Sequence, residues 1–176
     1  MPIIGWQMML KALQRKITAL YNRLYYERLL GKDPYQYQEL IHRFKISKIP
    51  INRIMQHNIL GLANTFINDL RFLADPLITK KFYPEVAGLV LQSLSRLEYA
   101  NFKLKNTYTF VKYLIKMLEK SKNSTYPGAS WGLPFTWYTY ITIPAYVPAS
   151  TTTSFVGYGL LDAFLFIAHL ILLDYI

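Results

Sequence analysis

Apolar residues recur at helical spacing near the start of the chain. The steps alternate between three and four residues, which places these side chains in one narrow seam of a helix that packs on another helix. The seam consists of Leu10, Leu13, Ile17, Leu20 and Leu24. It predicts a first helix from about Gly5 or Trp6 to Leu30, with Gly31 as the C-cap residue.

The same period continues along residues 50–73 and 84–122. Three predicted helices begin with a proline, which is favoured at the first helical position, and in two of them an N-cap Asp precedes it. The start signals are Asp33-Pro34, which opens a short helix to about Phe44, Asp75-Pro76, which opens another short helix, and Tyr83-Pro84. The pattern over 84–122 predicts one long helix with a kink or break near Asn106-Thr107.

The pattern changes at Asn123. Residues 123–132 are dense in turn residues, and 133–144 are aromatic and β-branched between prolines, so the latter stretch is expected to be extended. It reads as a single strand with no second strand nearby, and an unpaired strand is not stable alone. Residues 131–153 are therefore expected to lie on another subunit or on this chain's own helices, which favours an assembled protein.

Residues 154–176 form the most apolar stretch, and Asp162 and Asp174 are its only charges. About 20 apolar residues can cross a bilayer as a helix. An internal carboxylate is costly there, and neither flank carries Lys or Arg. Two interpretations remain open: a membrane span, or a helix buried in protein or against a lipid surface. Asp162 and His169 share a helical face and are expected to form a polar contact with a partner, with a proton path as the alternative.

Together the patterns predict an all-α fold, a helical bundle with a basic N-terminal helical arm and an extended aromatic segment before an apolar C-terminal helix. The expected units are the arm (1–48), a helical body (49–122), the extended segment (123–153) and the apolar helix (154–176).

Charge divides the chain at the same place. All 20 Lys and Arg and eight of the ten acids lie in residues 1–122, a net charge of +12, whereas 123–176 contain two Asp and no basic residue. This surplus fits a polyanionic partner, either nucleic acid or anionic lipid. The first 53 residues alone hold ten basic and three acidic side chains.

The candidate phosphate-binding residues are these ten bases, some of which fall opposite the leucine seam. They are Lys11, Arg15, Lys16, Arg23, Arg28, Lys32, Arg43, Lys45, Lys48 and Arg53. Arg43 to Arg53 also form a short link interrupted by Pro50. Lys103 to Lys122 either extend this surface or merely complement the helix dipole.

No motif in the sequence indicates catalysis. The chain has no cysteine, no glycine-rich phosphate loop, and only three histidines, His42, His57 and His169, at unrelated positions. We therefore expect no catalytic residues, no metal, no cofactor and no enzymatic activity. The first residues also lack the features of a secretory signal peptide.

The layout resembles a major capsid protein of the archaeal filamentous viruses, the rod-shaped and lipid-enveloped group. The resemblance lies in the basic arm, the absence of Cys, the abundance of Tyr and Ile, and the small apolar residues from Thr151 to Gly159. It implies a virion coat subunit, paired with an identical or paralogous copy, whose N-terminal helices enclose A-form double-stranded DNA in a helical filament. A lipid envelope would then face residues 154–176. The Trp-rich stretch 131–140 has no counterpart in this pattern.

A second interpretation comes from another class of protein. The apolar end and the aromatic, lysine-rich body also suit a small accessory subunit of a large membrane complex, anchored by one C-terminal helix. Binding to duplex DNA separates the two interpretations.

Overall fold

The computed structural model describes residues 2–33, 35–36, 39, 75–138 and 141–173, and these are mostly helical. The fold is all-α, as predicted, with two short strand pairs. The elements in chain order are α1 (Pro2–Tyr26), β1 (Leu30–Gly31), the 3₁₀ turn η2 (Asp75–Leu77), β2 (Lys81–Phe82), α5 (Pro84–Tyr99), α6 (Thr107–Ser121), β3 (Trp137–Tyr138), β4 (Thr142–Ile143) and α7 (Ser150–Leu173). The predicted helix over 50–73 and the basic link Arg43–Arg53 lie outside the described residues.

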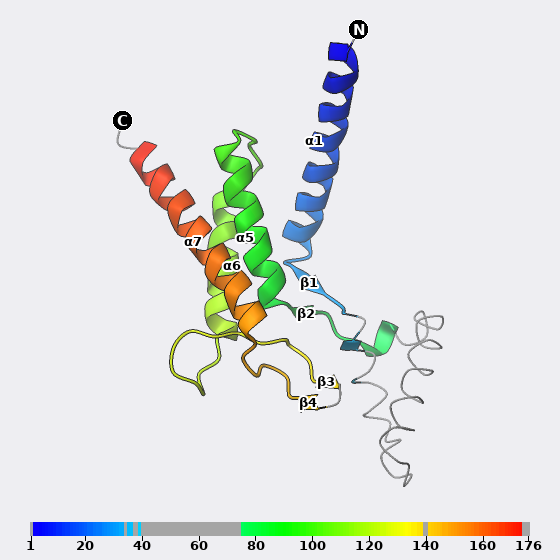
Figure 1. Cartoon of the computed structure of the whole chain (residues 1–176). Helices are drawn as coiled ribbons and strands as arrows, with labels where there is room; N and C mark the ends of the chain where they lie inside the picture. Colours follow the sequence, from blue (N-terminus) through cyan, green and yellow to red (C-terminus); the bar gives the residue numbers. More distant parts are fainter. Residues whose placement is uncertain (1, 34, 37–38, 40–74, 139–140, 174–176) are drawn as a thin grey trace.

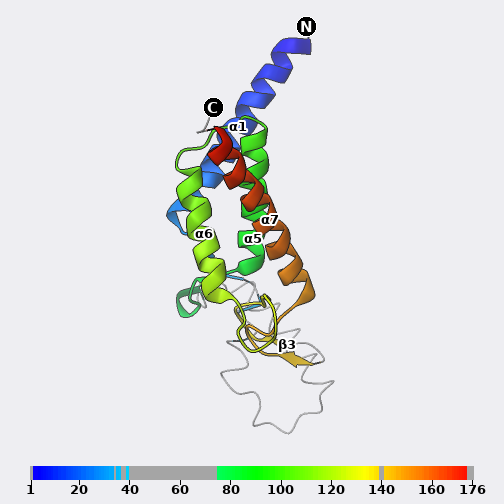
Figure 2. The same cartoon turned by 90° about the vertical axis from the view of Figure 1, so that its left-hand side faces the viewer.

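Three helices, α5, α6 and α7, form the bundle (Figures 1 and 2). α5 runs antiparallel to α6, and α7 packs along α5 in the most extensive contact between elements (Figure 1). Their apolar faces meet in one core, as the three-four spacing predicts. The buried side chains of the three helices include Ala87, Leu91, Leu94, Phe110, Val111, Leu114, Leu118, Val156, Ala163 and Phe166.

The α5–α7 contact is close because glycines face each other. A Cβ atom at Gly159 would lie 2.6 Å from the Cα of Gly88, and one at Gly88 would lie 2.9 Å from the Cα of Val156. Both distances are below any normal contact, so only glycine permits this approach. Gly157, two residues before Gly159, has open space where its Cβ would be.

α1 projects from the bundle as an arm (Figures 1 and 2). Only its last turns are anchored: Tyr21 is buried, and its hydroxyl donates a 2.6 Å hydrogen bond to the carbonyl of Lys105. Tyr21 and Tyr25 both pack edge-on against Phe110 of α6, with ring centroids 5.9 and 5.3 Å apart. The rest of the helix therefore lies beside the bundle without being part of it.

The predicted end of the first helix was wrong. α1 ends at Tyr26, and Arg28 and Leu29 have positive φ angles of 52° and 55°. The amide of Leu29 closes back onto the Leu24 carbonyl at 3.0 Å, as in a Schellman end. Leu29 is buried and the Tyr113 hydroxyl donates to the Arg28 carbonyl at 3.2 Å, so tertiary contacts fix an end that Gly31 was expected to provide. Gly31 lies in β1 instead.

The predicted long helix over 84–122 is two helices. It begins at Pro84 as expected, and a break is present near Asn106-Thr107, where α6 starts. The chain nevertheless leaves the helix already at Tyr99 and reverses direction, so the two halves pack on each other. Asn101 and Asn106 take left-handed conformations with φ of 60° and 61°, which asparagine adopts more readily than most residues.

The expectation of a single unpaired strand was also wrong. β3 pairs antiparallel with β4, Trp137 opposite Ile143 and Tyr138 opposite Thr142, so the stretch folds into its own hairpin. β1 and β2 form a second antiparallel pair.

The segment before the hairpin packs on the bundle of the same chain, one of the two placements expected. Trp131 and Phe135 are buried, and the Trp131 indole donates a 2.8 Å hydrogen bond to the Leu118 carbonyl near the end of α6. The C-terminal helix also starts earlier than predicted, at Ser150, because Ser150 to Thr153 are helical and not extended.

The start signal at Asp33 is used as predicted, and Tyr35, Gln36 and Glu39 are helical. The Asp33 side chain accepts from the Tyr35 amide at 2.8 Å, and the buried Gln36 side chain accepts from the Asp33 amide at 2.8 Å, a capping box. Gln36 also accepts from the Tyr83 hydroxyl at 2.9 Å and donates to the Thr79 carbonyl at 3.2 Å. One side chain thus ties the turn after β1 to the start of α5.

Candidate nucleic-acid interface

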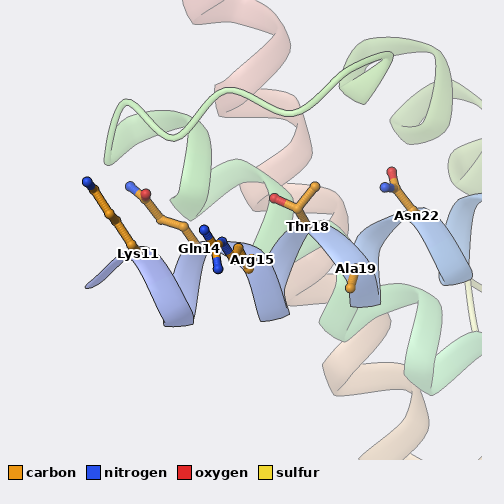
Figure 3. A pocket seen from close by; sticks show the side chains of 6 residues that line it. All are labelled: Lys11, Gln14, Arg15, Thr18, Ala19 and Asn22. Atoms are coloured by element: carbon orange, nitrogen blue, oxygen red, sulfur yellow. The ribbon is translucent and has the colours of Figure 1, made fainter. Parts of the chain in front are cut away.

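A stripe of polar side chains runs along the arm, one helical turn after another. We call it the α1 stripe; it consists of Lys11, Gln14, Arg15, Thr18 and Asn22. With Ala19 these residues line a shallow depression along the helix, and Figure 3 shows Lys11, Gln14, Thr18 and Asn22 leaving the helix on the same side. The stripe combines two positive charges with amide and hydroxyl groups, the side-chain types that contact phosphate and sugar in DNA complexes.

The charges of the α1 stripe are not compensated within the helix. Pro2 to Tyr26 contains Lys11, Arg15, Lys16 and Arg23 and no acid. Among the described residues, Lys11, Arg15 and Lys16 have no ion-pair partner, and all three are exposed. These three cations are therefore available to an external anion.

The other predicted binding residues in the described part of the chain have structural partners. Arg23 pairs with Glu27 at 3.2 Å, and Lys32 donates to the Asp75 carbonyl at 2.6 Å and lies 3.4 Å from its carboxylate. Arg28 lies over the Tyr113 ring, 5.5 Å from its centroid. The structure thus brings Lys11 and Arg15 together in the stripe, whereas Lys16 lies on another side of the helix, about 100° around the axis from Arg15. Arg43, Lys45, Lys48 and Arg53 lie outside the described residues.

Glu27, at the base of the arm, is held by the basic residues around it. The hydrogen bond from Arg23 lowers the pKa of its carboxyl below the ordinary value, and Lys80, whose ammonium lies 3.6 Å away, acts in the same direction. Glu27 therefore stays ionised next to its own cations and does not oppose an anion at Lys11 or Arg15.

Gln14, Thr18 and Asn22 were not among the ten binding residues predicted from the sequence, which are all Lys or Arg. The spacing was informative, because 11, 14, 15, 18 and 22 recur at steps of three and four opposite the leucine seam. A polar residue that continues such a stripe belongs to the same face whatever its type.

The N-terminal part of the leucine seam of α1 is not covered by the rest of the described chain, whereas Leu24 packs against the core. Leu10, Leu13 and Leu20 are each exposed by more than half, and Trp6 is 63% exposed. A seam of this spacing normally packs on another helix. The arm therefore presents one polar and one apolar face, and neither is buried in the bundle.

α7 presents a second uncovered apolar face. Its stretch Ser150–Ile171 is long and apolar enough to cross a bilayer, and 22% of the most apolar part is buried in the described structure. Tyr158, Leu161, Phe164 and Ile171 are all more than half exposed. Packing on α5 therefore covers only part of the apolar surface of α7.

The structure gives Asp162 and His169 different partners on the bundle. The Asp162 carboxylate lies 3.5 Å from the Arg96 guanidinium, and the His169 ring lies 5.7 Å from the Tyr99 ring, both on α5. Both side chains of this face thus have contacts within the chain, and the charge of Asp162 lies next to a cation.

Within the described ranges, no three His, Asp or Glu side chains gather as a metal-ion site would require. The depressions found among these residues are shallow, and one of them lies between α1 and the start of α5, lined by Leu20, Leu24, Tyr83 and Val86 among others. The most distinctive feature remains the two-faced arm.

Comparison with known proteins does not narrow the class further. No protein-family model matches the chain, and neither the curated proteins nor the solved structures contain a match.

Proposed function

We propose that this protein is a structural coat subunit that binds double-stranded DNA through sequence-independent phosphate contacts and assembles with further copies, or with a paralogous subunit, into a helical filament. The observation that carries the proposal is the two-faced arm. Lys11, Arg15 and Lys16 of α1 have no ion-pair partner among the described residues, and the N-terminal part of the leucine seam on the same helix is uncovered.

Solubility alone would not require a helix that carries cations without acids. Lysines on a solvated helix are usually interleaved with acids, whereas α1 contains none. Phosphate contacts need cations and hydrogen-bond donors but no base-reading motif, which agrees with the composition of the α1 stripe. In this role the arm lies along the duplex and the seam packs on the arm of another subunit. The DNA is held in A-form, and α7 faces a lipid envelope.

The test is binding of the purified protein to a labelled DNA duplex of arbitrary sequence, followed by fluorescence anisotropy at several salt concentrations. Affinity should not depend on sequence and should fall steeply with salt, because each neutralised phosphate releases counterions. Replacing Lys11, Arg15 and Lys16 together by Gln should weaken binding at least tenfold and lower the slope of log K against log salt by about two to three.

A matched control removes the same charge elsewhere. Lys80, Lys103 and Lys122 are exposed, and each pairs with an acid, respectively Glu27, Glu98 and Glu119. Replacing these three by Gln gives the same net charge and should leave the salt slope close to that of the unmodified protein. If the two variants bind DNA alike, or if the unmodified protein shows no binding at about 50 mM salt, where phosphate contacts are strong, the proposal is wrong.

The geometry of the duplex has its own readout. Double-stranded RNA is always A-form, so it should compete for the protein at least as well as DNA of the same length. Much weaker competition by the RNA would refute the A-form part of the proposal and leave DNA binding intact.

The exposed face of α7 supports a second candidate, a small accessory subunit anchored in a membrane complex by this helix. Such a protein would need detergent for extraction and would show no salt-dependent DNA binding. A coat subunit would stay in solution or form filaments without detergent.

A further inference from the structure

A second set of cations lies on α6, outside the arm. We call it the α6 row; it consists of Lys112, Lys116 and Lys120, which are four residues apart and therefore stacked along one side of the helix. All three are exposed, and none has an ion-pair partner among the described residues. The one acid of α6, Glu119, is held by Lys122 at 2.7 Å.

The α6 row lies on the same side of the molecule as the α1 stripe. α1 and α6 run in the same general direction in Figure 1, and they meet where Tyr21 and Tyr25 pack on Phe110. Viewed from their N-terminal ends, successive residues turn about 100° clockwise. The centre of the α1 stripe lies about 55° clockwise from the tyrosines that face α6.

On α6, the row is displaced in the opposite sense, counterclockwise, from the residues that contact α1. Phe110 and Tyr113 face α1, since Phe110 meets the two tyrosines and the Tyr113 hydroxyl donates to the Arg28 carbonyl. The centre of the row lies about 90° counterclockwise from these two residues. When two parallel helices face each other, residues displaced clockwise from the contact on one helix and counterclockwise on the other point to the same side of the pair. The stripe and the row therefore belong to one surface.

Two further cations lie at the junction between the helices. Arg28, which follows α1, is exposed and lies over the Tyr113 ring of α6. Lys105, which precedes α6, is exposed and receives the Tyr21 hydrogen bond at its carbonyl. Neither has an ion-pair partner within the described part of the chain, so positive charge continues from one helix to the other.

We infer that the α6 row is part of the DNA-binding surface: the α1 stripe, Arg28, Lys105 and the α6 row form one continuous face for the phosphates of a duplex. The inference rests on the proposed function and adds the side of the bundle that meets the DNA. The duplex then lies along both helices, on the face opposite the core of α6, and is not enclosed by the arm alone. The tyrosines between the helices hold the two rows of cations at a fixed spacing.

The experiment compares two triple variants of equal net charge. Replacing Lys112, Lys116 and Lys120 by Gln removes the α6 row, and the triple replacement of Lys80, Lys103 and Lys122 is the control. All six side chains are exposed, so folding is checked simply by matching circular dichroism spectra. The α6 variant should bind duplex DNA at least tenfold more weakly than the control, with a salt slope reduced by about two to three.

Chemical labelling adds a readout that does not depend on substitution. Acetylation of the unmodified protein with and without DNA, followed by mass spectrometry, should show protection of Lys112 and Lys116 together with Lys11. Lys80 should remain equally reactive in both conditions.

The outcomes separate this inference from the function on which it rests. Suppose that the unmodified protein binds DNA, that the α6 variant binds as the control does, and that Lys112 and Lys116 of the unmodified protein stay reactive when DNA is bound. The arm then binds alone and the inference is wrong. If the unmodified protein binds no DNA, both fail. If the α6 variant loses binding to anionic phospholipid vesicles while DNA binding is unchanged, the row serves a lipid surface, which also overturns the inference.

Discussion

At the scale of single residues, the absence of two side chains sets a tight constraint on the packing of the described helices. Gly88 and Gly159 bring the backbones of α5 and α7 into direct contact, and this contact aligns Val156, Ala163 and Phe166 with the core. Because both sides of the approach are backbone, neither helix can adjust a side-chain rotamer to admit another atom.

The expected result of Gly159→Ala is a loss of about 1 to 3 kcal/mol in the free energy of unfolding, since overpacking forces the helices apart. Gly157→Ala is the matched control, since it adds the same atom two residues away in open space, and a helical Gly→Ala change should gain about 0.4 to 1 kcal/mol. Urea denaturation measures both. Equal effects of the two substitutions would contradict the close approach.

At the scale of elements, the turn after β1 and the start of α5 are joined through one hydroxyl. Tyr83 is 8% exposed and donates to Gln36. Burial disfavours the phenolate and raises the pKa of Tyr83 well above its ordinary value near 10. The stability that accompanies the neutral hydroxyl is therefore fully present below pH 10 and is lost as the pH rises further.

Tyr83→Phe should lower the free energy of unfolding at pH 7 by about 1 kcal/mol, because it removes one buried hydrogen bond. The difference from the unmodified protein should shrink as the pH is raised from 9 to 11, since phenylalanine has no proton to lose. Tyr158→Phe, at an exposed position, should follow the unmodified protein throughout. Urea midpoints across this pH range check the prediction, and a constant difference would refute it.

The elements also show what the sequence could and could not predict. The existence of α1 and α5 followed from the spacing of apolar residues, that of α7 followed from the length of its apolar stretch, and the starts at Asp33 and Pro84 followed from local capping chemistry. The end of α1 did not, because it depends on the burial of Leu29 and on the hydrogen bond that the Tyr113 hydroxyl donates to the Arg28 carbonyl, 85 positions earlier in the chain. The pairing of β3 with β4 was missed because two-residue strands leave almost no alternation to detect.

The candidate site was predictable in part for the same reason. Lys11 and Arg15 could be placed on one helical face from spacing alone, whereas the engagement of Arg23 by Glu27 and of Arg28 by Tyr113 depends on how the chain continues. The relation between α1 and α6 required the contact of Tyr21 and Tyr25 with Phe110, which no local pattern contains.

At the scale of the whole molecule, the uncovered apolar faces predict association. Leu10→Gln with Leu13→Gln should leave the unfolding free energy of a single chain within about 0.5 kcal/mol, because both leucines are half exposed and Gln is nearly as good a helix former. The same pair should reduce self-association, which sedimentation velocity measures over a range of protein concentrations.

The control for this prediction places the same residue type on another face of the arm. Ala12→Gln with Ala19→Gln changes exposed positions outside the leucine seam and should associate as the unmodified protein does. If the leucine variant associates equally well, the seam is not the contact between subunits.

The polar and the apolar face of the arm belong to one helix that is anchored at one end. The proposed packing of the seam and the proposed binding of DNA are therefore thermodynamically linked. Once the seam has packed on a neighbouring subunit, the loss of freedom needed to lay the arm along DNA has already been incurred. The next ligand then binds with less entropic cost, and by reciprocity bound DNA favours the packed seam to the same degree. If the arm acts as proposed, filament growth along a duplex should be cooperative, so that free DNA and fully covered DNA coexist with few partly covered molecules between them.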